Sequence, residues 1–168
     1  MLKTIKIIYM IVIELSKKGN CRWVTQHTSA NIWDIEPMVI PRCARCFGVF
    51  IFWKSIVNRN VIHSVTGIHL PPGSPSFTKS VSKELLNRIR DDVPKGQPYH
   101  IIFGGGKIDT PQNRFLYSTS IKKYIFALKN MFPFVPIEFY KPKENTWFTT
   151  MVLKKEGEIS TTQYYPKN

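Results

Sequence analysis

The sequence predicts a single α+β domain, residues 1–168, with a mainly antiparallel sheet, two principal helices and a C-terminal β-hairpin. The length of 168 residues suits one domain with a sizeable core, and 43% of the residues are hydrophobic. Short segments rich in β-branched and aromatic residues cluster in both halves of the chain. Two segments with helical spacing of apolar residues separate these clusters, an order that is typical of α+β proteins.

The N-terminal half is expected to consist of strands. Residues 5–15 are rich in Ile and Val, and residues 21–27 are a second candidate strand. The segment CFGVFIFWKSIV, residues 46–57, has the composition of a buried strand. NRN, residues 58–60, then predicts a turn, and VIHSVTGIHL, residues 61–70, predicts the returning strand of a hairpin.

The segment PPGSPS, residues 71–76, is the clearest break in the chain. We interpret it as a boundary between two layers of one domain. After it, residues 76–92 are predicted to form the first helix, because apolar residues recur there at helical spacing. A short strand, YHIIF at residues 99–103, leads from there into the glycine run Gly104–Gly106.

The second helix is expected to begin at Ser118 or Thr119, where a hydroxyl side chain can cap its first turn. Directly before it, RFLYS at residues 114–118 has the composition of a strand. Three further strands are expected at residues 135–141, 147–154 and 159–165, of which the last two form the C-terminal hairpin.

The charge of the chain points to a polyanionic partner. The formal net charge is +13, the isoelectric point is about 9.8, and the basic excess is spread over both halves. Nucleic acid is the commonest partner of such a protein, and an anionic membrane surface is the next. The residues expected to contact nucleic acid are Lys107, Arg114, Lys122, Lys123, Lys141 and Lys143.

Aromatic residues interleave with this charge, for example Phe50, Phe52 and Trp53 beside Lys54. Such mixtures suit RNA or single-stranded DNA, because bases stack on rings while phosphates meet Lys and Arg. An alternative is that the aromatic residues form a core below a solvated basic face. A separate alternative for the function is a small protein-interaction module without chemistry.

A hydroxyl triplet and a pair of acids suggest an enzyme instead. Phe115 precedes Ser118-Thr119-Ser120, and the acids Glu156 and Glu158 follow downstream. This pattern resembles the Arg-Ser-Glu class of mono-ADP-ribosyltransferases over residues 115–158. The family's aromatic-Arg-Gly motif has no counterpart in this chain.

The resemblance implies NAD as the co-substrate and a catalytic role for three residues. Glu158 would hold the ribose and stabilise positive charge in the transition state. Glu156 would orient the nucleophile, and Ser118 would position the catalytic carboxylate.

The glycine run continues into Lys107, giving FGGGK at residues 103–107. Backbone N–H groups of such a run can hold a phosphate. The sequence favours a flexible loop between two strands, because no Ser or Thr follows the lysine as in a P-loop.

The three cysteines and one histidine lie close together in the sequence, at Cys21, His27, Cys43 and Cys46. Three Cys and one His are a permitted ligand set for zinc, so a zinc site is one prediction and buried free thiols are the alternative. An odd number of cysteines favours an intracellular, reducing location. The longest apolar run is too short to cross a membrane.

Overall fold

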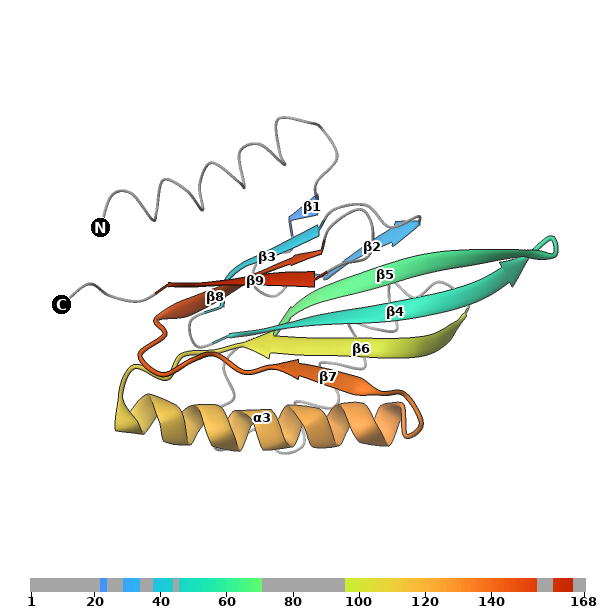
Figure 1. The fold of residues 1–168 in the computed structure, drawn as a ribbon. Helices are drawn as coiled ribbons and strands as arrows, with labels where there is room; N and C mark the ends of the chain where they lie inside the picture. The colour runs from blue at the N-terminus through green and yellow to red at the C-terminus, as the bar shows by residue number, and fades with distance from the viewer. Residues whose placement is uncertain are drawn as a thin grey trace.

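The computed structural model describes residues 22–23, 29–33, 38–43, 46–70, 96–153 and 159–164. These residues form three layers: a four-stranded sheet, a five-stranded sheet and the helix α3 (Pro111–Met131) (Figure 1). The four-stranded sheet has the order β1 (Arg22–Trp23), β3 (Met38–Cys43), β8 (Phe148–Leu153), β9 (Ile159–Tyr164). The five-stranded sheet has the order β2 (Ser29–Trp33), β5 (Asn60–Leu70), β4 (Phe47–Val57), β6 (Gln97–Gly105), β7 (Ile137–Tyr140).

Strand β4 lies at the centre of the five-stranded sheet and is buried on both faces. Successive side chains of a strand point to opposite faces. Val49 and Ile51 therefore belong to the core beneath α3, with Tyr124 and Leu128 of the helix. Phe50 and its neighbours on the same face belong to a second core, with residues of β3 and β8. The two cores hold the three layers together.

The hairpin of β4 and β5 confirms the prediction for residues 46–70. Val57 pairs with Asn60, which leaves Asn58 and Arg59 as a two-residue turn. Both turn residues have positive φ, 51° and 67°, as a type I′ turn requires. The hairpin extends well past the other elements of the molecule (Figure 1).

Helix α3 connects two parallel strands. Strands β6 and β7 pair in parallel, and a parallel pair needs a crossover connection, which α3 provides. The helix begins at Pro111, and the Thr110 side chain accepts a hydrogen bond of 3.1 Å from the Asn113 N–H. Thr at the N-cap with Pro at the first helical position is a strong start signal.

The predicted strand at residues 114–118 is therefore wrong, because those residues form the second turn of α3. The helix also does not begin at Ser118 or Thr119, which lie in its middle. The strand was predicted because aromatic residues such as Phe115 and Tyr117 favour strands. Propensity is a weak signal, and here the cap at Thr110 and the packing of Tyr117 against the sheet decide the conformation.

The remaining expectations are partly testable. Strands β8 and β9 form the predicted C-terminal hairpin, and five of the seven strand pairings among the described residues are antiparallel. The strand at 5–15, the helix at 76–92 and the turn at 154–158 lie outside the described residues. Strands β2 and β3 were not predicted.

No helix in the described part of the chain has the length and apolar composition needed to cross a bilayer.

Candidate nucleic-acid interface

Four of the six predicted nucleic-acid-binding residues lie near the start of α3. Lys107 precedes the helix and Arg114 lies in its second turn. Lys141 and Lys143 are exposed in the loop between β7 and β8. Arg114 joins this loop to the helix through an ion pair of 3.0 Å with Glu144, both side chains being largely exposed.

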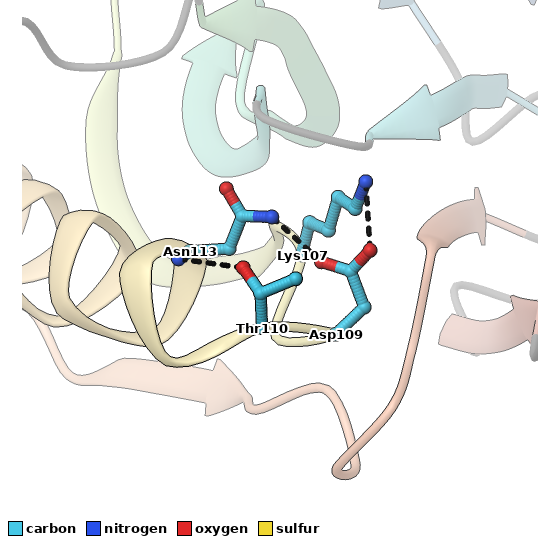
Figure 2. Close-up of polar contacts among 4 residues, drawn as sticks. All are labelled: Lys107, Asp109, Thr110 and Asn113. Atoms are coloured by element: carbon cyan, nitrogen blue, oxygen red, sulfur yellow. Dashed lines mark hydrogen bonds and ion pairs between the residues drawn. The ribbon is translucent and has the colours of Figure 1, made fainter.

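Lys107 takes part in a polar cluster that fixes the helix start (Figure 2). Its Nζ lies 2.8 Å from the Asp109 carboxylate and 5.4 Å from the centroid of the Trp147 ring. The Asn113 side chain donates a second hydrogen bond of 2.7 Å to Asp109. Lys107 is therefore engaged within the protein, and we infer a structural role for it.

Asp109 is held in its charged form. Burial alone would raise its pKa, but hydrogen bonds from Lys107 and Asn113 and the charge of Lys107 outweigh that effect and lower the pKa. The Asp109 side chain is only 10% exposed. The cluster thus stabilises the junction between β6 and α3 and presents little free charge to a ligand.

The other two predicted residues, Lys122 and Lys123, lie in the middle of α3. Lys122 is exposed, whereas Lys123 is partly buried and has a contact of its own. No acid of the described segments lies within ion-pair distance of Lys122. Of the six predicted residues, Lys122 is thus the one on α3 best placed to meet a phosphate.

Lys122 belongs to a line of exposed residues along the outer side of α3, which we call the outer stripe. It consists of Phe115, Ser118, Lys122, Phe126 and Lys129, at intervals of three or four residues. Residues at these intervals share one side of a helix. The rings of Phe115 and Phe126 are 71% and 66% exposed, respectively. The stripe therefore alternates accessible aromatic rings with accessible charge.

The outer stripe faces solvent because the opposite side of α3 is anchored to the sheet. Tyr117, Tyr124 and Leu128 are buried and pack against β4 and β6. Tyr124 lies edge-on to Phe47, with 5.6 Å between ring centroids. A rotation of α3 that buried Phe115 and Phe126 would therefore expose the core residues on its opposite side.

The aromatic residues of β4 are in the cores. Phe50, Phe52 and Trp53 are at most 4% exposed. Trp53 donates a hydrogen bond of 2.9 Å to the Thr66 hydroxyl, and its ring meets Phe132 edge-on. These three rings cannot stack on bases without unfolding. The predicted helix start lies seven residues after the observed one, which assigned Phe115 to a strand. Phe126 lies within the predicted helix, but its exposure was not predicted.

The described acids are all engaged with basic side chains. Asp109 pairs with Lys107 and Glu144 with Arg114, while Glu138 lies 3.5 Å from the His100 ring. The remaining charge on the described surface is therefore positive, for example at Lys54, Arg59 and Lys129.

The residues of the transferase resemblance are only partly described. Ser118 is exposed in the middle of α3, and it does not end a strand as the family's serine does. Glu156 and Glu158 lie outside the described residues. The resemblance and its requirement for NAD stay predictions.

The glycine run joins a strand to a helix, which corrects the expectation of a loop between two strands. Gly104 and Gly105 end β6, and Gly105 and Gly106 have φ of 104° and 91°. All three are buried. A Cβ on Gly106 would collide with the Tyr117 ring. Gly106 is thus explained by the close approach of α3, whereas a Cβ on Gly105 would collide with Cys43 on the other side of the sheet.

Two of the four predicted zinc ligands are described. Cys43 and Cys46 are buried free thiols, and Cys43 Sγ lies 3.8 Å from His69 Nε2. Burial raises the pKa of both thiols, and the charge of Cys46 raises that of Cys43 further.

Cys21 and His27 lie outside the described residues, so the full zinc set stays a prediction. Within the described ranges, no group of three or more His, Cys, Asp or Glu side chains is arranged to hold a metal ion.

Comparison of the sequence with models of known protein families finds no match, and comparison with curated proteins finds none either.

Proposed function

We propose that this protein binds single-stranded nucleic acid along the outer stripe of α3. The observation that carries the proposal is the exposure of Phe115 and Phe126 on the same line as Lys122 and Lys129. Two exposed rings beside lysines on one side of a helix suit a strand of nucleotides, because bases stack on the rings while phosphates meet the lysines.

The dimensions of the stripe support several contacts with one strand. From Phe115 to Lys129 the helix rises about 21 Å, because each residue adds about 1.5 Å. Bases can stack on the two rings while the phosphates between them meet Lys122 and Lys129. Stacking is worth about 1–3 kcal/mol per base and is tolerant of sequence, so we expect little sequence specificity.

The test is a fluorescence anisotropy titration with labelled oligo-U and oligo-dT. Phe115→Ala with Phe126→Ala should weaken binding by at least about tenfold, because two stacking contacts are lost. Phe134→Ala is the matched control, since Phe134 is 97% exposed but lies after the end of α3. Unchanged affinity in the double variant would contradict the proposal.

A second pair of variants separates local contacts from overall charge. Lys122→Glu with Lys129→Glu changes the net charge by as much as Lys141→Glu with Lys143→Glu. The first pair should lose clearly more affinity, because it lies on the outer stripe. Equal losses would show that the total charge, and not α3, attracts the strand. A comparison of oligo-U with oligo-dU, which differ only in the 2′-hydroxyl, shows whether that group contributes.

A further inference from the structure

A group of neighbouring rings, some of them exposed, lies on the five-stranded sheet, on the face opposite α3. We call it the ring cluster, and it consists of Phe52, His63, Tyr99 and His100. Phe52 belongs to the core on the side of β3 and β8, which fixes the face of the cluster. His63 lies on the same face, because Val65, two residues further along β5, belongs to that core too.

A bulge in β6 brings two rings of the cluster to one face. Phe52 pairs with His100 and Trp53 pairs with Pro98, so Tyr99 is the extra residue between them. A bulge of this kind redirects a side chain locally. Tyr99 and His100 both contact Phe52 as a result, with ring centroids at 6.1 Å and 5.7 Å.

The cluster is accessible from solvent. Tyr99 is 40% exposed, and His63, which meets it edge-on at 5.6 Å, is exposed as well. Phe52 lies buried beneath them and supports their rings. Such an arrangement of exposed rings on a sheet face can stack on bases, as the sheets of RNA-binding domains do.

Positive charge and apolar surface continue from the cluster to the tip of the hairpin. Lys54 pairs across the strands with His63, and Arg59 lies in the turn. Ile56 and Val61, which pair with each other, are 75% and 51% exposed. The hairpin end projects past both α3 and the four-stranded sheet (Figure 1). The acid on this face of the described sheet, Glu138, is engaged by His100.

The ring cluster and the outer stripe thus lie on opposite sides of the five-stranded sheet. A strand on one surface would have to pass around the edge of the sheet to reach the other. We infer that the ring cluster, with Lys54 and Arg59, is a second site for single-stranded nucleic acid, so that one molecule holds two separate strand segments. This inference rests on the proposed function of α3 and extends it from binding one strand to bridging two.

A bridging assay tests the inference. Biotinylated oligo-dT is fixed to beads, and fluorescent oligo-dT is added with the protein, since two such strands cannot pair with each other. The wild-type protein should retain the fluorescent strand. Tyr99→Ala should lower the retained signal about five- to hundredfold, because one stacking contact is lost. Lys54→Glu, an exposed substitution that leaves the rings in place, should also lower it.

Binding of a single oligonucleotide, measured by anisotropy, distinguishes the possible failures. If Tyr99→Ala and Lys54→Glu bridge the two strands as well as the wild-type protein does, the second site is refuted. Self-association of the protein would then account for the bridging. If the wild type binds one strand but never bridges, the inference fails and the proposed function stands. If it binds no strand at all, the proposed function fails first. Phe134→Ala should leave both binding and bridging unchanged.

Discussion

Tyr117 carries a buried hydroxyl group that has no hydrogen-bond partner among the described residues. Its ring packs against Phe47 and Phe139 at 5.8 Å and 6.4 Å between centroids. Leaving a buried polar group unpaired destabilises a protein by about 1–3 kcal/mol. Tyr117→Phe removes the hydroxyl and keeps the ring, so we expect the folded state to gain about 1 kcal/mol. A thermal melt should show a rise of about 2–4 °C. A fall of similar size would reveal a hydrogen-bond partner for the hydroxyl.

Asp109 should make the stability of the protein dependent on pH in the acid range. Its pKa is lowered in the folded protein, so its contribution is fully present above the ordinary aspartate pKa of about 3.9. The contribution is lost as the pH falls through the lower, folded value. Asp109→Asn should therefore cost about 1–2 kcal/mol at pH 7 in urea unfolding. The difference from the wild type should shrink below about pH 4. A difference independent of pH would mean that shape, and not charge, matters at this position.

Helix α3 allows a direct test of where it begins. Thr110→Ala removes the N-cap and should cost about 1 kcal/mol of stability. Ser118→Ala, in the exposed middle of the helix, should be neutral or stabilise by a few tenths of a kcal/mol, because Ala is the better helix former. Urea unfolding of the two variants measures both. The opposite order, with the larger loss at Ser118, would place the helix start there.

At the scale of elements, the β4–β5 hairpin could be predicted because its information is local. A run of β-branched and aromatic residues predicts the strands, and the turn at Asn58 and Arg59 determines their register. The start of α3 also has a local signal, which is Thr110 followed by Pro111. Phe115 made the start of the helix hard to recognise, because an aromatic residue on the solvent side interrupts the amphipathic pattern of a helix.

The candidate site was less predictable than the fold. The sequence shows that Lys122 is charged, but it does not show whether an acidic side chain pairs with it. Lys107 is engaged by Trp147 and Arg114 by Glu144, partners that lie tens of residues away in the chain. Only the tertiary structure brings them together. Tyr99 and His63 of the ring cluster are likewise joined by strand pairing and a bulge, which no local pattern indicates.

The whole molecule carries a strong positive charge, and its nucleic-acid binding should follow the ionic strength. The net charge is +13, and each acid of the described residues already has a basic neighbour. The logarithm of the binding constant should fall linearly with the logarithm of the salt concentration. Lys122→Gln with Lys129→Gln should reduce the slope by about 1.4, because each contacted phosphate of a single strand contributes about 0.7. An unchanged slope in anisotropy titrations would show that these lysines touch no phosphate.

The pairing of β3 with β8 has a consequence for how the protein is synthesised. Met38 pairs with Leu153, so about two thirds of the chain separates the two paired residues at the centre of the four-stranded sheet. Strands β4, β5 and β6 leave the ribosome well before β8 does. Until then Phe50 and Ile102 lack the β8 side chains, among them Met151, that cover them in the finished protein. A nascent chain that pauses before residue 148 thus presents an apolar sheet face, a natural binding surface for chaperones and a risk of aggregation.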